Sequence, residues 1–140
     1  MELLAVVVLI GIFAAIATAR YGRSIFAEFG AHGGARELSL ALLGAQRSSI
    51  TTGDNHYAEF DAAQATSYRL MRRGDAGLVE VRGWEPLSDD VTISVSSTVM
   101  EFTFEGQALD GYTIDCVGED RSFRLEVIMI SGTVRMTDTT

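Results

Sequence analysis

The chain has 140 residues, enough for one small domain with an appendage and too few for most multi-domain enzymes. It carries 11 basic and 19 acidic residues, a net charge of −8, and every basic side chain is an arginine. Non-specific nucleic-acid binding depends on basic side chains that neutralise phosphates, so this balance disfavours nucleic acid as a partner.

The first element in chain order is an apolar segment from Leu3 to Ala19, in which Thr18 is the only polar side chain. Seventeen helical residues rise about 26 Å, close to the ~30 Å hydrocarbon core of a bilayer. If this segment were a buried core helix, its lack of a polar face would require protein on all sides, which one small domain cannot supply. The segment therefore predicts a transmembrane helix, residues 1–20, built from Leu3, Leu4, Val6, Val7, Val8, Leu9, Ile10, Ile12, Phe13 and Ile16.

A cleaved signal peptide is the alternative interpretation of this segment, because residues 17–19, Ala-Thr-Ala, have the small-x-small form of a cleavage site. A signal peptide carries positive charge before its apolar core, whereas Glu2 is the only charged residue there. Arg20 and Arg23 follow the segment, so the positive-inside rule alone would place the C-terminal domain in the cytoplasm. Glu2 is either a helix-end charge or an intramembrane acid with a cationic partner.

Residues 2–17 resemble the N-terminal segment of type IV pilins and type II secretion pseudopilins. Glu2, Gly11 and the pair Ala14-Ala15 stand at the same relative positions as in that family's segment. The resemblance implies that Glu2 acts in assembly, by neutralising the N-terminal amine of a neighbouring subunit. It also implies a methylated, single-pass protein of the bacterial inner membrane with its C-terminal domain in the periplasm. Its partners would be other pilins or pseudopilins through the N-terminal helix, membrane lipid and the inner-membrane assembly platform.

The family's glycine processing site and the Phe-Thr-Leu that follows it are absent before Glu2. We therefore expect an incomplete N-terminus, preceded in the natural gene by a basic leader. Such a leader would also remove the conflict with the positive-inside rule.

Residues 21–53 are predicted to form the periplasmic, amphipathic half of the helix. Gly30, Gly33 and Gly34 each weaken a helix by about 1 kcal/mol relative to alanine, which predicts a kink or short break near residues 30–34. From Ala35 onward two neighbouring stripes follow the helical period. One carries Leu38, Leu42, Ala45 and Ser49, and the other Arg36, Leu40, Leu43 and Arg47. This pattern predicts a helix laid on a sheet and capped by Gly53.

From residue 54 to residue 140 the apolar period changes to two, which predicts an antiparallel β-domain with Gly and Asp at its turns. Phe102 and Phe104 are expected on one face of their strand, with Glu101 and Thr103 on the other. A hairpin is expected at Ser131-Gly132. The predicted strands are His56–Phe60, Thr66–Arg72, Leu78–Trp84, Val91–Val95, Val99–Phe104, Tyr112–Cys116, Phe123–Ile130 and Thr133–Met136. The fold class is α+β, with a long N-terminal helix packed on the β-domain.

Three further segments resemble the minor pseudopilin H (GspH/FimT-like) group. Residues 35–53 are similar to the helix end of that group, residues 102–106 to its Phe-x-Pro-x-Gly strand without the proline, and residues 130–136 to its terminal hairpin. The paired cysteines of many major type IV pilins are also missing, which favours a minor subunit. The resemblance implies a minor pseudopilin of a type II secretion system, or alternatively a type IV minor pilin acting in pilus assembly or DNA uptake.

The sequence has no constellation that points to an enzyme, a cofactor or a metal. It has no Gly-x-Ser-x-Gly elbow, and His32 and His56 lack metal-ligand spacing and are interpreted as solvated. Cys116 is expected in the core of a strand. The acids Asp110, Asp115, Glu119 and Asp120 are interpreted as solvated turn residues, with a calcium loop as the alternative.

Arg69, Arg72 and Arg73 form a basic cluster on a predicted strand. The cluster is interpreted as a charged strand face, and a partner- or DNA-binding patch remains the alternative.

Overall fold

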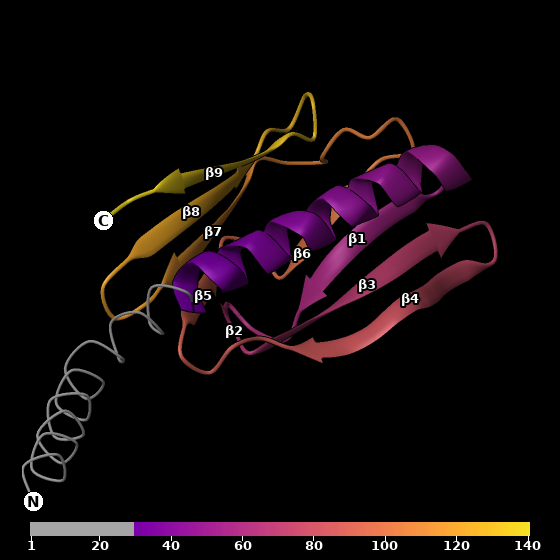
Figure 1. Ribbon diagram of the computed structural model, residues 1–140. Coiled ribbons are helices and arrows are strands. Elements are labelled where there is room, and N and C mark those ends of the chain that lie inside the picture. Colours follow the sequence, from indigo (N-terminus) through magenta and orange to yellow (C-terminus); the bar gives the residue numbers. More distant parts are fainter. Residues whose placement is uncertain (1–29) are drawn as a thin grey trace, which may run out of the picture.

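The computed structural model describes residues 30–140, which form one helix followed by antiparallel strands in two sheets (Figure 1). The described part of the helix covers residues 30–52. The first sheet has the order β4 (Gly77–Pro86), β3 (Ser67–Gly74), β1 (Asn55–Phe60) and β6 (Val99–Phe102). The second has the order β2 (Gln64–Ala65), β5 (Thr92–Val95), β7 (Tyr112–Val117), β8 (Ser122–Val127) and β9 (Val134–Asp138).

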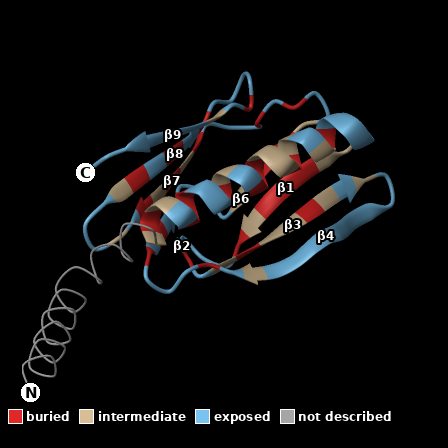
Figure 2. Ribbon diagram, in the orientation of Figure 1, coloured by how far each residue is buried: buried red, intermediate tan, exposed pale blue. Residues whose placement is uncertain are grey.

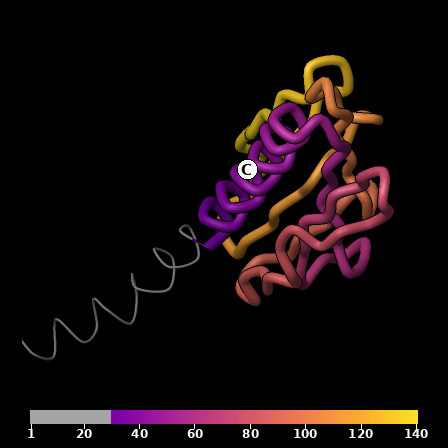
Figure 3. The backbone as a smooth tube through the Cα atoms, turned by 90° about the vertical axis from the view of Figure 1, so that its right-hand side faces the viewer, coloured from indigo at the N-terminus to yellow at the C-terminus, as the bar shows by residue number. Residues whose placement is uncertain are grey.

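The helix lies along the strands with both sheets packed against it. In Figure 1 the strands β8 and β9, in gold to yellow, and the β3–β4 hairpin, in rose to salmon, lie on opposite sides of the helix, and Figure 3 shows the helix lying along one face of the strands. One hydrophobic cluster contains side chains of the helix and of both sheets. The α+β class predicted from the sequence is therefore confirmed for the described residues.

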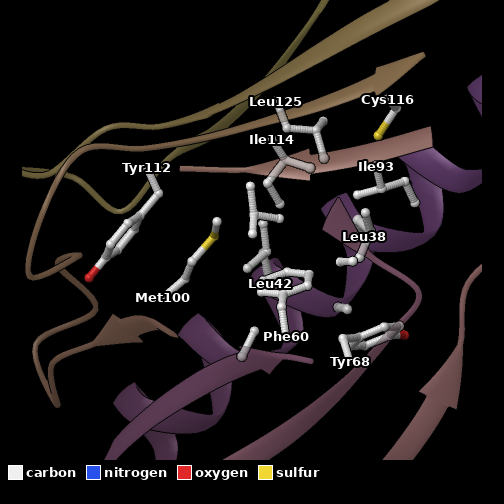
Figure 4. Packing of buried hydrophobic residues seen from close by; sticks show 14 of the residues in the cluster. Leu38, Leu42, Phe60, Tyr68, Ile93, Met100, Tyr112, Ile114, Cys116 and Leu125 are labelled. Atoms are coloured by element: carbon white, nitrogen blue, oxygen red, sulfur yellow. The ribbon is translucent and has the colours of Figure 1, made fainter. Parts of the chain in front are cut away.

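The predicted apolar stripe of the helix is the stripe that faces this core. Leu38, Leu42, Ala45 and Ser49 are each at most 2% exposed. Figure 4 shows Leu38 and Leu42 between Ile114 and Leu125 of the second sheet and Phe60 and Tyr68 of the first. Burying each leucine contributes about 1.5–3 kcal/mol, so this stripe fixes the helix to the sheets.

The helix ends where the sequence predicts. Gly53 has a φ of 74°, and its N–H donates to the carbonyl of Ser49 at 3.0 Å. A glycine adopts this left-handed conformation without steric cost, so it stops the helix and turns the chain into β1.

The short break predicted near residues 30–34 does not occur within the described helix, which is continuous through Gly33 and Gly34. A kink between this helix and residues 1–29 lies outside the described residues. Packing of Ala31 and Ala35, both fully buried, compensates the weak helix propensity of the glycines.

Each of the eight predicted strands has a counterpart, and β2 was missed because it has only two residues. Two predicted strands are too long. β6 ends at Phe102 because Thr103 N–H donates to the carbonyl of Gln107 and turns the chain. Phe104 is therefore 56% exposed in a loop and does not share a face with Phe102, which is fully buried.

The hairpin between β8 and β9 is wider than the predicted two-residue turn. β8 ends at Val127, and the Ile128 N–H donates to the carbonyl of Thr133 at 3.0 Å, which closes a loop over residues 128–133. Ile128 and Ile130 thus lie in an exposed loop instead of a strand.

Cys116 lies in β7 and is fully buried, as predicted. Burial, with a smaller contribution from Asp115, raises the pKa of its thiol to about 12. The prediction that His56 is solvated is wrong. The side chain is 4% exposed, and its Nδ1 lies 3.0 Å from the Asp54 carbonyl oxygen. His32 is half-buried, with its ring edge against Phe123.

Among residues 30–140, no helix is long and apolar enough to cross a bilayer.

Candidate partner-binding surfaces

The three arginines singled out in the sequence all lie in β3, but the strand separates them. Arg69 and Arg73 lie on the sheet face that carries Trp84 and Tyr57, at 4.8 Å and 5.8 Å from those rings. Arg72, on the alternate position, faces the opposite side, where its Nε is 3.7 Å from Asp54. The structure therefore does not bring the three together as one strip.

Each of these arginines also has an acidic neighbour. Arg69 Nε donates to Glu59 at 2.7 Å, with Glu80 at 3.5 Å. Arg73 Nε is 3.2 Å from Glu101. The hydrogen bond from Arg69 to Glu59 raises the pKa of Arg69. A phosphate would have to compete with these carboxylates for the same donors, so the geometry favours the interpretation as a charged strand face.

Glu101 is a charged residue whose role the sequence did not reveal. It is only 7% exposed, and its carboxylate accepts hydrogen bonds from Asn55 Nδ2 at 2.9 Å and Arg73 Nη2 at 3.3 Å. A buried carboxylate without such partners is strongly unfavourable. Arg73 thus neutralises the buried Glu101, and a ligand would have to compete with that carboxylate for it.

A groove with a volume of about 510 Å³ separates the helix from β3 and β4. Its helix wall includes Leu40, Ala41 and Gly44, and its sheet wall includes Leu70 and Val81. The side chain of Leu40 is 60% exposed and that of Val81 is 52% exposed. In Figure 2 the whole length of β4 beside this groove is exposed except near its end.

Acidic groups gather on the rim of the groove. The Tyr68 hydroxyl donates to Glu85 at 2.8 Å and lies 3.5 Å from Glu37. Burial, and then the hydrogen bond to Glu85, raises the pKa of Tyr68 above its usual range. Among residues 30–140, Arg82 is the only cation that lines the groove, and its Nη1 lies 3.5 Å from Glu85. Within that part of the chain Glu37 forms no ion pair, and two carboxylates face one guanidinium across the groove.

The second exposed surface consists of two loops that Gln46 holds against the end of the helix. Gln46 Nε2 donates to the Gly106 carbonyl at 2.8 Å and to the Ser131 carbonyl at 3.0 Å. Gly132, with a φ of 62°, packs so closely that a Cβ there would lie 2.1 Å from the Gly106 oxygen. The apolar side chains that these loops expose are Phe104, Leu109, Ile128, Met129 and Ile130.

The described residues contain no group of three or more His, Cys, Asp or Glu side chains placed to hold a metal ion. Asp115, one of the acids considered for calcium, binds Arg124 through two hydrogen bonds of 2.7 Å and 3.1 Å. Asp110 accepts a hydrogen bond from the N–H of Gly111. Both carboxylates are therefore engaged within the fold.

The remaining predicted site residues, Glu2 and the apolar side chains of the predicted membrane helix, lie outside the described residues.

No family model and no curated protein matches the sequence. The structure, however, is similar to the minor pseudopilin EpsH of the Vibrio cholerae type 2 secretion system, with a TM-score of 0.66 and 13% identity over 78% of this chain and 97% of that chain. It is also similar to the Pseudomonas aeruginosa type IV minor pilin FimU, with a TM-score of 0.64 and 13% identity over 76% of this chain and 87% of that chain.

This chain has a pilin-like fold. Both neighbours are pilin or pseudopilin subunits and neither is an enzyme. A second EpsH structure, at a TM-score of 0.59, has the same pilin-like fold and supports the same comparison. The described residues therefore agree with the resemblance carried by the N-terminal sequence.

Proposed function

We propose that this protein is a minor pseudopilin of a type II secretion system, a structural subunit of the periplasmic pseudopilus that helps drive protein export. The observation that carries the proposal is the combination of a pilin-like fold over residues 30–140 with a pilin-like apolar segment at residues 3–19. Neither part depends on the other, because one rests on structure and the other on sequence.

In this proposal the protein acts by association. Residues 3–19 hold the subunit in the inner membrane and pack with the helices of neighbouring subunits. Glu2 attracts the N-terminal amine of a neighbour, because a lone carboxylate in the membrane is unfavourable unless it is neutralised. The β-domain stands in the periplasm and presents the groove and the Gln46-bound loops to other subunits.

A type IV minor pilin is the second candidate. It is supported by the likeness to FimU, whose TM-score of 0.64 nearly equals the 0.66 for EpsH. Fold alone does not separate two such related assemblies.

Deletion of the gene in its source bacterium tests both candidates. The pseudopilin proposal predicts that secreted proteins accumulate in the periplasm while surface pili remain, and that a plasmid copy restores export. Loss of pili with normal export would support the minor pilin instead. Unchanged export and unchanged pili would contradict both.

A further inference from the structure

One bond of the main chain has chemistry that neither the fold nor the proposed function uses. Asp110 is followed by Gly111, and no other aspartate or asparagine of the sequence precedes a glycine. The pair lies in the loop between β6 and β7, and both residues are exposed. Because glycine has no Cβ, the nitrogen of Gly111 is open to close approach by the carboxyl group of Asp110.

The structure places these two groups together. The Gly111 N–H donates to Oδ1 of Asp110 at 2.7 Å. A carbon–oxygen bond adds only about 1.2 Å, so Cγ of Asp110 lies within about 4 Å of the same nitrogen. A Cβ at Gly111 would meet nothing within 4 Å. The loop therefore has room for the side chain and the main chain to close into a ring.

Other aspartates of the described residues lack this combination. Asp75 is also exposed in a turn, but Ala76 follows it and carries a methyl group beside the nitrogen that would have to react. The carboxylate of Asp115 is bound by Arg124 through two hydrogen bonds, so it is held away from its own main chain. Asp110 alone combines an exposed loop, a following glycine and a carboxylate that already contacts the next backbone nitrogen.

We propose that Asp110-Gly111 is a site of spontaneous modification, at which the aspartate converts to isoaspartate through a cyclic imide. In the first step the Gly111 nitrogen gives up its proton and bonds to Cγ of Asp110, whose carboxyl group is in its neutral form. The bond from Cγ to the hydroxyl oxygen breaks, and that oxygen leaves with both protons as water. The step requires no enzyme, oxidant or reductant.

Water then opens the ring at one of its two carbonyl carbons. Attack at Cγ breaks the new carbon–nitrogen bond and restores aspartate. Attack at the main-chain carbonyl carbon of Asp110 breaks the original peptide bond instead, so the chain continues through Cβ and Cγ. The product, isoaspartate, has one extra carbon in its main chain and carries the former main-chain carboxyl group as its side chain.

The extra carbon enters the chain between two anchored residues. The Leu109 N–H donates to the Glu101 carbonyl at 2.9 Å, and Tyr112 pairs with Val127 of β8. Leu109 is also one of the apolar side chains exposed by the two loops that Gln46 holds. The modification thus changes a surface that the proposed function assigns to contacts with other subunits, although the chemistry does not depend on that function.

Ageing of the purified full-length protein in detergent tests the proposal. The protein is incubated at physiological temperature and mildly acidic pH, because the ring forms from the neutral carboxyl group. Peptide mass spectrometry should detect an Asp110 peptide that is lighter by one water. After transfer to neutral pH, this species should be replaced by a peptide of the original mass with a different retention time. A protease that cleaves before aspartate, and not before isoaspartate, should leave that peptide uncut at residue 110.

Two variants and one internal control accompany the measurement. The Asp75 peptide of the same digest should keep its mass and retention time. Gly111→Ala should lower both Asp110 products to the level of the Asp75 peptide, and the free space around residue 111 accommodates the methyl group. Asp110→Glu keeps the carboxylate but prevents the five-membered ring, so it should give neither product.

A synthetic peptide of residues 107–113 sets the time scale of the reaction in the absence of the fold. The proposal is overturned if the protein contains neither product by the time that half of this peptide has reacted, because the fold would then prevent the ring from closing. Equal yields in the wild type and in Gly111→Ala would also overturn it. Both outcomes are scored on purified protein, so they leave the proposed function untouched.

Discussion

Gln46 and Gly106 are joined by a hydrogen bond of 2.8 Å that ties the last turns of the helix to the loop after β6. The same side-chain nitrogen donates to Ser131 in the loop between β8 and β9. One amide group thus connects the helix to two loops that are 60 and 85 residues away in sequence.

Gln46→Ala should therefore lower the free energy of unfolding by about 1–2 kcal/mol, because two carbonyl groups lose their donor. Hydrogen exchange should increase in residues 128–133 more than in β1 or β3. Gln46→Glu is the sharper variant, since it keeps the shape of the side chain and removes both donors. Unchanged exchange in residues 128–133 of either variant would contradict this role.

Gly132→Ala should be more damaging than a typical glycine substitution. Its Cβ would lie 2.1 Å from the Gly106 oxygen and 2.5 Å from Gln46 Nε2, in a backbone with φ of 62°. Strain and the lost hydrogen bonds together should cost roughly 2–4 kcal/mol in a chemical denaturation experiment. Gly111→Ala is the control, because a Cβ there meets nothing within 4 Å. Similar midpoints for the two variants would show that the loops can move apart at little cost.

Asp61 should make the stability of the fold depend on pH in the acidic range. Its carboxylate accepts hydrogen bonds from the Thr66 hydroxyl at 2.5 Å and the Thr66 N–H at 2.9 Å. The Thr66 hydroxyl contributes most, and these bonds lower the pKa of Asp61 from 3.8 to about 2. Because the folded protein holds the charged form, this stabilisation is complete above the unfolded pKa and is lost as pH falls from about 4 towards 2.

The comparison of the wild type with Asp61→Ala measures this effect. The difference in unfolding free energy should be constant near neutral pH and should shrink as the pH is lowered below about 4. A difference that stays the same down to pH 2 would mean that the charge of Asp61 does not contribute.

The full-length protein should bind DNA weakly at physiological salt. Arg69, Arg72 and Arg73 face two sides of a sheet and each lies near a carboxylate, so few phosphate contacts are possible. Fluorescence anisotropy with double-stranded DNA measures the affinity. Sub-micromolar binding that is lost when all three arginines are changed to alanine would instead support the DNA-uptake function.

Glu2→Ala should leave the melting temperature of the β-domain unchanged, because the helix from residue 30 onward and both sheets already share one hydrophobic core. In cells that express the full set of subunits, it should reduce crosslinking to neighbouring pilins or pseudopilins. Crosslinking at the wild-type yield would reduce Glu2 to a helix-end charge.

Much of this architecture follows from local sequence pattern. Leu38 and Leu42 define a helix face by their spacing alone, and the period of two from residue 54 onward locates all the longer strands. The ends of strands are less predictable. Phe104 and Ile130 continue the apolar pattern beyond β6 and β8, and only the backbone hydrogen bonds of the loops show where each strand stops.

The candidate surfaces are harder to predict than the strands, because their side chains bind partners that are distant in sequence. The cluster of Arg69, Arg72 and Arg73 is visible in the sequence, but their acceptors lie in several different elements. Arg73, for example, is paired with Glu101, which is 28 residues further along the chain. Gln46 has no local signal, because both of its acceptors are backbone carbonyls of loops that the sequence pattern predicts poorly.

The irregular pairing of β4 has a consequence for the behaviour of free subunits. β4 is a ten-residue edge strand with exposed valine, leucine and tryptophan side chains, a combination that can recruit other strands and seed aggregates. Its register against β3 shifts twice, between Tyr68 and Leu70 and again between Leu70 and Met71. Such bulges bend the strand and interrupt its ladder of donors and acceptors. We therefore expect these bulges to oppose pairing of β4 with the edge strand of another molecule.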